Sequence, residues 1–486
     1  MTDLSPLPPA SSPDSAAPDR PTSDARTDSA AAIAHPEDAG PTGAETTGWM
    51  PLTAGQMDFW EEFRFHPDQP VSTVAHCLEL EGPLDSAALA TAITRTVAEA
   101  DTLALRFCET ADGRVVQRVD PACRPRLTQI DLRHDADPDA TARALMRADL
   151  NAPLDLRHQP LSAQMLLRVG ARRWLWYCRG HHIILDGFGM ALIERRVARL
   201  YAQALGQGGG GAAFGRLADF LHEETAYAAS PDCARDRAFW ADALAPFRDR
   251  LPVLRKGAED YGTPPLCAGF RAGPEVESAL NAAAARLDTH WADALTLLSA
   301  VWLACHDPGR SDAGPVPVWL PYMSRMGSLS ANIPAMVVNI MPLIVDPRQA
   351  QPLPALLARL GKVLRRQRRH GRYRIEDLAR DCGLGAGQRF HFTPLVNVMP
   401  FDPPRFAGLT VRRQVLAAGP GDGFNLSFTA DARGAGLTAS IEADPATQDR
   451  ALFPRRVAGF QHWLRATVHD LAQGGDGARA MARGAG

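Results

Sequence analysis

The segment His181-His182-Ile183-Ile184-Leu185-Asp186-Gly187 follows the apolar stretch Trp174–Arg179 and precedes a region with apolar residues at helical spacing. This order predicts a strand, a turn and a helix. Strand ends that face a helix N-terminus are where α/β proteins place reactive groups. A neutral imidazole can accept a proton from an amine or hydroxyl group. Gly187 allows close backbone approach, and its N–H can face a developing oxyanion.

The histidine pair alone leaves three interpretations open. Either histidine can be a structural residue of the core or turn. A metal site is disfavoured, because adjacent residues of a strand point to opposite faces and no HExxH motif or further ligand cluster is present. The third interpretation is acyl transfer with a single histidine base.

Further from this segment, the pattern predicts two halves that each mix strands and helices, hence an α/β (α+β) fold. In the first half we expect a helix over 54–63, a strand over 71–80, a helix over 84–100, a hairpin over 162–179 and a helix over 189–205. In the second half we expect helices over 276–287, 291–305, 353–369 and 454–471, and strands over 316–321, 336–345, 395–401 and 424–430. The expected organisation is a disordered acidic tail rich in Pro, Ala and Ser (1–47), an N-terminal lobe (48–205), a linker and C-terminal lobe (206–472) and a frayed tail (473–486).

Composition excludes several classes of protein. The 486 residues carry a formal net charge of −3, so they lack the basic excess of a nucleic-acid binder. The eight cysteines form no CxxC pair, which favours a reducing compartment. No membrane span and no signal peptide is predicted, and we expect a cytoplasmic protein.

Motifs along the chain resemble those of condensation domains of nonribosomal peptide synthetases. His181–Gly187 matches the HHxxxDG signature, which condensation domains share with related CoA-dependent acyltransferases of the chloramphenicol-acetyltransferase-like superfamily. Five further segments, before and after this signature, resemble the family's other motifs and occur in the family's order. They are Leu52–Gln56 with Trp60, Glu99–Phe107, Phe239-Trp240 with Leu244, Asn332–Pro342 and Thr393–Val398. The segment Glu99–Phe107 departs from the family's common sequence for that motif. In Asn332–Pro342, another residue replaces the glycine that the family usually has. The resemblance covers about residues 48–471.

The resemblance implies two chloramphenicol-acetyltransferase-like lobes in a V, with a substrate tunnel between them. It implies that His182 deprotonates or orients the nucleophile and that Gly187 stays small so that the substrates meet. His181 then supports the motif, as does Asp186, paired with Arg325 of the second lobe. Asn397, Asn339 and Ser324 are expected to line the tunnel.

The resemblance also implies the partners. The donor is an acyl group on the phosphopantetheine arm of a peptidyl or acyl carrier protein, and the acceptor is an amine or alcohol, soluble or carrier-bound. No cofactor or metal is expected on the chain itself. Neither an adenylation segment nor a carrier segment is seen in the sequence. We therefore expect a free-standing enzyme that acts in trans and transfers the carrier-bound acyl chain to a soluble acceptor. An inactive recruitment domain and an acyl-CoA-dependent acyltransferase remain alternatives.

Overall fold

The structure is a computed structural model that describes residues 48–259, 261, 263–306, 314–346, 352–419 and 421–477. The predicted acidic tail (1–47) and residues 478–486 of the predicted C-terminal tail lie outside the described residues. Of the helices in the described ranges, none has the length and apolar character that a membrane crossing requires.

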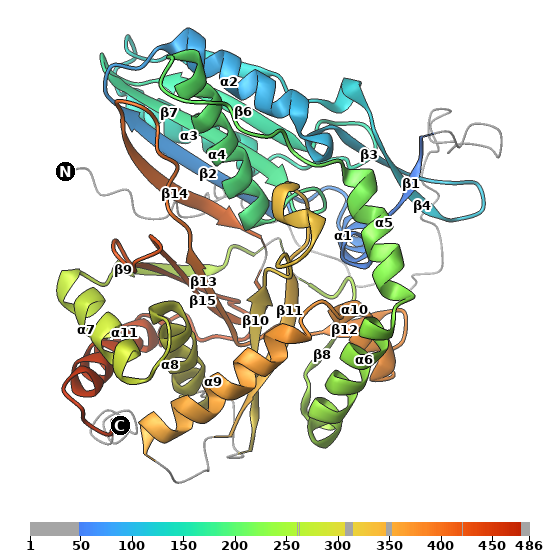
Figure 1. Cartoon of the computed structure of the whole chain (residues 1–486), viewed down its shortest axis with the longest axis vertical. Coiled ribbons are helices and arrows are strands. Elements are labelled where there is room, and N and C mark those ends of the chain that lie inside the picture. The colour runs from blue at the N-terminus through green and yellow to red at the C-terminus, as the bar shows by residue number, and fades with distance from the viewer. Residues whose placement is uncertain are drawn as a thin grey trace, which may run out of the picture.

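The first lobe is built on a five-stranded mixed sheet. Its strands, in spatial order, are β14 (Thr410–Ala418), β2 (Thr73–Glu81), β7 (Arg173–His181), β6 (Ser162–Arg168) and β5 (Leu127–Asp131). A small sheet of β1 (Met50–Pro51), β4 (Val115–Val119) and β3 (Leu105–Glu109) lies beside it. The helices of this lobe are α1 (Ala54–Phe65), α2 (Ser86–Glu99), α3 (Pro138–Leu150) and α4 (Gly187–Ala204). In Figure 1 this lobe is the upper one.

The second lobe is built on a six-stranded mixed sheet. Its strands, in spatial order, are β11 (Asn339–Val345), β10 (Val316–Tyr322), β13 (Leu395–Pro400), β15 (Phe424–Ala430), β16 (Thr438–Ala443) and β9 (Leu266–Arg271). A two-stranded sheet is formed by β12 (Gln388–Phe390) and β8 (Val253–Arg255). The helices are α6 (Pro231–Leu244), α7 (Pro274–Arg286), α8 (Trp291–Cys305), α9 (Leu353–Arg369), α10 (Ile375–Asp381) and α11 (Phe453–Ala472). Helix α5 (Leu217–Ala228) precedes them, and its buried side chains pack into the core of the first lobe.

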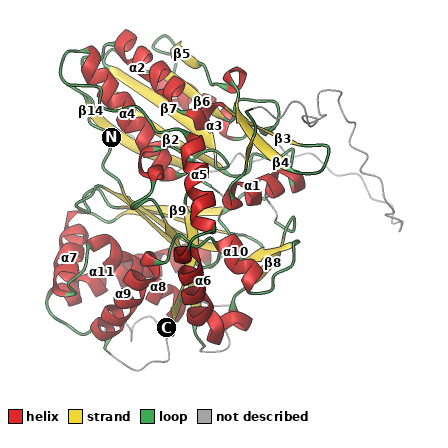
Figure 2. Cartoon of the chain, turned by 45° about the vertical axis from the view of Figure 1, so that its right-hand side comes forward, coloured by secondary structure: helices red, strands yellow, loops and turns green. Residues whose placement is uncertain are grey.

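Among the described residues, helices cover one face of the second sheet. Leu426, Phe428 and Ile441 of β15 and β16 pack into a core with side chains of α7, α8, α9 and α11. Figure 2 shows these helices on the side of the sheet away from the first lobe. The alternate residues of the same strands face a cavity between the lobes. Since successive residues of a strand point to opposite faces, these strands are apolar on one side and polar on the other.

The second half of the chain contributes segments to the first lobe, beyond the predicted division at residue 205. Strand β14 comes from the C-terminal part of the chain, yet it pairs antiparallel with β2 over the whole strand (Figure 1). Phe406 also packs in the core of the first lobe, as do Ile333, Ala335 and Val337. These crossings bring residues of the second half of the chain against the histidine motif.

Local sequence explains where several elements begin. Thr53 caps α1 in a capping box, in which its side chain accepts from the N–H of Gln56 and the Gln56 side chain accepts from the N–H of Thr53. Helix α4 begins at Gly187, two residues before the predicted start, because the carboxylate of Asp186 accepts from the N–H of Gly189 and so caps the helix.

Candidate active site

The histidine motif is the turn that joins β7 to α4. Strand β7 ends at His181, and its Trp176 and Cys178 are fully buried, so the turn leaves the sheet from a rigid base. The N–H groups of Ile184 and Leu185 donate to the carbonyls of His181 and His182. The side chain of Gln56 donates to the carbonyl of Ile183, which ties α1 to the turn.

His182 is held on three sides. Its backbone N–H donates to the carbonyl of Ser72 at 2.6 Å. The ring of Phe59 stacks on the imidazole with centroids 5.3 Å apart and an interplanar angle of 2°. The carbonyl of Ala418, at the end of β14, accepts a hydrogen bond from the imidazole. Nδ1 has no hydrogen-bond partner among the described residues, so this bond is made through Nε2.

The environment keeps His182 neutral. Burial lowers the pKa of the imidazole below its usual value, and the charge of Asp186 and the bond to Ala418 offset this only in part. A neutral imidazole on the cavity wall is the form that can accept a proton.

Gly419 is a contact of His182 that sequence reasoning missed. A Cβ at this position would lie 2.5 Å from Cδ2 and 2.7 Å from Nε2 of His182, and the residue has a φ of +89°. Its N–H donates to the carbonyl of Thr73 at 2.9 Å, which fixes the end of β14 against β2. Only glycine meets both the backbone conformation and the close approach.

His181 occupies a structural position. Its side chain is 2% exposed, and Nδ1 accepts a hydrogen bond from the N–H of Ile183 at 3.1 Å. Burial, with smaller contributions from His182 and Arg179, lowers its pKa to about 3. The residue is therefore neutral at physiological pH, and it is not among the residues that line the cavity.

Asp186 and Arg325 form the expected contact between the lobes. One guanidinium nitrogen of Arg325 lies 2.8 and 2.9 Å from the two carboxylate oxygens of Asp186, and both side chains are buried. The carboxylate also accepts from the N–H groups of Gly189, Val337 and Val338. Burial raises the pKa of Asp186, but Arg325 and the N–H donors outweigh it, so the pKa lies below its usual value. With this many donors, the carboxylate acts as a brace for the turn.

The other guanidinium contacts of Arg325 hold the loop that follows β10. Its nitrogens donate to the carbonyls of Ser330, Ile333 and Ala335 at 2.5, 2.8 and 2.7 Å. The guanidinium also lies 5.1 Å from the ring centroid of Phe188. Arg325 thus fixes a segment of the second half of the chain against the first turn of α4.

The three residues predicted to line a tunnel differ in their positions. Asn397 and Ser324 line the cavity. The prediction for Asn339 is wrong. Its side chain is 1% exposed, and it donates to the carbonyls of Gly371 and Tyr373 while accepting from the N–H groups of Ile340 and Ile375. All of its hydrogen-bonding capacity is used by backbone, so it holds α10 to β11.

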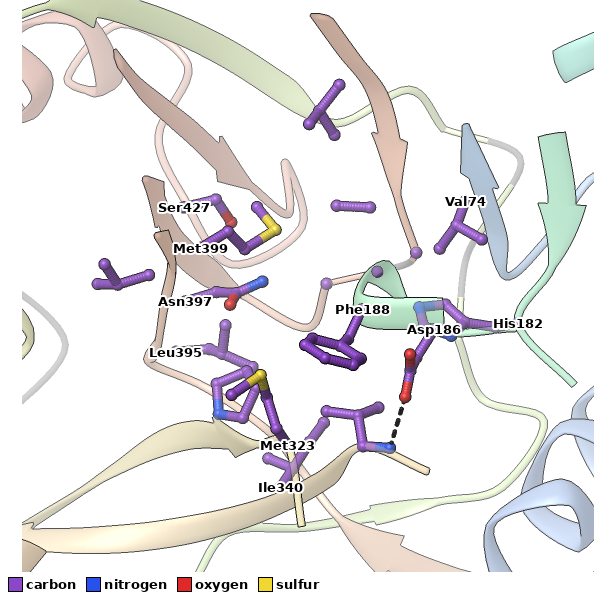
Figure 3. Close-up of a pocket in the computed structure, with 18 of the residues that line it drawn as sticks. Val74, His182, Asp186, Phe188, Met323, Ile340, Leu395, Asn397, Met399 and Ser427 are labelled. Atoms are coloured by element: carbon purple, nitrogen blue, oxygen red, sulfur yellow. Dashed lines mark hydrogen bonds between the residues drawn. The ribbon is translucent and has the colours of Figure 1, made fainter. Parts of the chain in front are cut away.

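The cavity that contains His182 lies between the lobes and has a volume of about 2020 Å³. Figure 3 shows His182, Asp186 and Val74 on one side of it, Phe188 in the middle, and Asn397, Met399 and Ser427 on the other side. A Cβ on Gly187 would project into this space, with Met399 Sδ at 4.0 Å as its nearest contact. The fold therefore has room for a side chain at Gly187, and the space beside His182 is left open for reactants.

No three His, Cys, Asp or Glu side chains gather as a metal site would require, as far as the described residues go. One polar wall of the cavity has a recognisable pattern in the sequence. Asn425, Ser427 and Thr429 alternate with apolar residues in β15, as do Thr438, Ser440 and Glu442 in β16. No local sequence pattern indicates the roles of Phe59 and Gly419, because their contacts with His182 depend on the tertiary structure.

Comparisons with known proteins follow the same residues. The model of the condensation domain family matches residues 46–475. The chain is 37% identical over 412 residues to isonitrile lipopeptide synthase of Streptomyces coeruleorubidus, covering 84% of this chain and 28% of that protein. It is 34% identical over 402 residues to enterobactin synthase component F of Escherichia coli O157:H7, covering 79% of this chain and 30% of that protein. The chain thus spans less than a third of the length of these relatives.

Solved structures of similar sequence share the fold. VibH, described as a nonribosomal peptide synthetase condensation enzyme, is 30% identical with a TM-score of 0.77, covering 87% of this chain and 96% of VibH. The starter condensation domain of rhizomide synthetase RzmA, solved as a mutant in complex with C8-CoA, is 30% identical with a TM-score of 0.76, covering 88% and 96%. The expectation of two lobes in a V of the chloramphenicol-acetyltransferase type is confirmed.

Proposed function

The chain belongs to the condensation domain family of nonribosomal peptide synthetases, and on this premise we propose that it joins a carrier-bound acyl thioester to an amine or hydroxyl acceptor. The observation that carries the proposal is the neutral imidazole of His182 on the wall of a cavity that both lobes line. The product is an amide or an ester of a natural-product pathway. The eight free cysteines support a reducing compartment, the cytoplasm, as its place of action.

The reaction is an acyl transfer with one proton transfer. The acceptor nitrogen or oxygen attacks the thioester carbonyl, a C–N or C–O bond forms, and the C–S bond breaks. His182 accepts the proton of the attacking group, and the departing thiolate takes up that proton as a thiol. Alignment of the two reactants beside Gly187 supplies much of the rate, because two bound reactants no longer meet by diffusion.

Carrier proteins are the proposed source of the donor. A phosphopantetheine arm would enter the cavity and present the thioester next to His182, so the chain itself needs no resident cofactor. VibH, of which 96% is matched, is described as a condensation enzyme, which supports condensation activity of this chain. Action in trans is part of the proposal. We also propose that the acceptor is a soluble molecule, so that its attack releases the acyl group from the carrier protein.

An acyl-CoA donor is the second candidate, and one observation favours it. The RzmA starter domain, similar to this chain over 88% of its length, is described in complex with C8-CoA. CoA carries the same pantetheine thioester as a carrier protein, so the same site can accept both.

The test is single-turnover acyl transfer followed by intact mass spectrometry. The whole protein is mixed with an acylated carrier protein and a panel of amines and alcohols, and in parallel with the same acyl group on CoA. Loss of the acyl mass from the carrier, together with appearance of the amide or ester, supports the proposal. Transfer from CoA alone, with none from the carrier, favours the second candidate.

His182→Ala is the matched variant. Within the described part of the chain, the imidazole makes one hydrogen bond, to the carbonyl of Ala418, and circular dichroism checks that the variant is folded. Unchanged transfer by folded His182→Ala would contradict the assigned role. A wild-type protein that binds the acylated carrier but never transfers its acyl group would favour the inactive recruitment domain instead.

A further inference from the structure

One wall of the cavity is the uncovered face of the second sheet. Three rows of side chains cross it, set by the register of β13, β15 and β16. The first row holds Leu395, Asn425 and Glu442, the second holds Asn397, Ser427 and Ser440, and the third holds Met399, Thr429 and Thr438. All of them line the cavity. Along β15 and β16 the wall therefore becomes more polar with distance from the row of Met399, whose sulfur lies nearest to Gly187.

Glu442 is a carboxylate without a partner on this wall. In the part of the chain that the structure describes, its side chain makes no hydrogen bond and no ion pair. Its neighbours across the sheet are Asn425 and Cys267, neither of them a cation. Burial alone raises the pKa of Glu442 above its usual value. The side chain is half-buried and lines the cavity, so its carboxylate is open to a hydrogen-bond donor or a positive charge that enters there.

The cations of the surrounding elements do not supply this charge. Arg389 is committed to Asp422 and Glu259, at 2.5 and 2.9 Å. Arg271 of β9 lies opposite Thr438, four positions along β16 from Glu442. Residues four apart in a strand are separated by about 13 Å.

Asn425 gives a second and independent observation at the same place. It is 5% exposed, and within the described ranges neither Nδ2 nor Oδ1 has a hydrogen-bond partner. Gly421 makes room for it, because a Cβ on Gly421 would lie 1.9 Å from Nδ2 of Asn425. Buried amides are hydrogen-bonded in nearly all proteins, so a group from outside the chain is the natural partner.

From this arrangement we infer that Glu442, Asn425 and Ser440 bind a basic nitrogen of one of the two substrates. The inference rests on the proposed function and names the substrate class for the same cavity. A carboxylate, an amide oxygen and a hydroxyl oxygen present acceptors, and an ammonium group offers three donors and a positive charge.

The position of the subsite sets the shape of the substrate. Glu442 lies four residues along and two strands across from Met399. At strand spacings of about 3.3 Å per residue and about 4.8 Å per strand, that separation is on the order of 15 Å. The basic nitrogen thus belongs to an extended molecule, such as a long amine or a peptidyl group of about four residues.

The test measures binding, not catalysis. Octylamine and octanol have the same chain and differ in the head group. We expect the wild-type protein to bind octylamine about tenfold more tightly than octanol in calorimetric titrations. Glu442→Gln, which keeps the shape and removes the charge, abolishes this preference. Glu81→Gln is the matched control, since Glu81 is an exposed carboxylate elsewhere on the cavity lining, and it keeps the preference.

Melting temperatures separate a binding role from a structural one. A half-buried carboxylate without an ion pair does not stabilise the free protein, so Glu442→Gln is expected to melt at the same or a higher temperature. A lower melting temperature, equal binding of amine and alcohol by the wild type, or an unchanged preference in Glu442→Gln overturns the inference. His182→Ala is expected to keep the amine preference. Amine binding without any acyl transfer would therefore contradict the proposed function and leave this subsite in place.

Discussion

The substitution Gly187→Ala tests whether the small residue is needed for the reactants or for the stability of the fold. The new Cβ has Met399 Sδ, at 4.0 Å, as its nearest neighbour, which is an ordinary van der Waals distance. Gly187 is the first residue of α4 and has no left-handed backbone conformation. The methyl group points into the cavity beside His182.

The two expected effects have opposite signs. Because the chain tolerates the methyl group and loses backbone freedom in the unfolded state, stability should stay level or rise by about 0.4–1 kcal/mol. A reactant displaced by about 1 Å can lose about 100-fold in rate. That corresponds to about 2.7 kcal/mol of transition-state stabilisation.

Gly189→Ala is the control within the same helix turn. A Cβ there would lie 2.8 Å from Leu185 Cδ1 and 3.2 Å from the carbonyl oxygen of Ala335. Overpacking of this kind costs about 1–3 kcal/mol. Gly189 is not among the cavity residues, so its variant should lose stability first.

The assay combines urea unfolding with kcat/KM for acyl transfer from a carrier protein. We expect full stability with weak activity for Gly187→Ala, and reduced stability for Gly189→Ala. Wild-type kcat/KM in Gly187→Ala would refute it, as would a loss of stability in that variant comparable to that of Gly189→Ala.

Further predictions concern the residues that hold the motif. Arg325→Met leaves the buried carboxylate of Asp186 without its cation and should lower the free energy of unfolding in urea by about 3–5 kcal/mol. A decrease below about 1 kcal/mol contradicts the bracing role of this pair. His181, with a folded pKa of about 3 against 6.5, binds protons only when unfolded, so stability is full above pH 6.5 and falls as the pH drops toward 3. His181→Asn, which keeps an acceptor but does not titrate, should remove about 2 kcal/mol of the loss expected by pH 5, and equal acid sensitivity of both proteins argues against this. Gly419→Ala pushes on His182 and should lower kcat, whereas Gly408→Ala, with a similar φ of +73° and nothing within 4 Å, should not; equal kcat in both variants contradicts the positioning role. The lowered pKa of His182 places the acid limb of kcat/KM below pH 6.5, and a limb above that value shows that another group titrates.

Elements with strong local signals were predicted within a few residues. Helix α1, the hairpin of β6 and β7 and the amphipathic helix α9 belong to this group, since each is fixed by residues close together in sequence. Strands β14 and β16 were not predicted. The sequence of β14, Thr410–Ala418, contains two adjacent arginines and gives no clear alternation. Its pairing with β2 supplies the structure that local propensity does not.

The sequence by itself determined the strand, turn and helix around His182, because Asp186 caps α4 within three residues of its own position. Through motif resemblance it also indicated Arg325 as the partner of Asp186. Only the tertiary structure decided that Ala418 and Gly419 contact the imidazole and that Asn339 braces backbone instead of lining the cavity. It also placed Asn425 beside Glu442. These contacts join residues far apart in the chain, and they depend on strand register and on which face of a sheet each side chain takes, which local sequence does not fix.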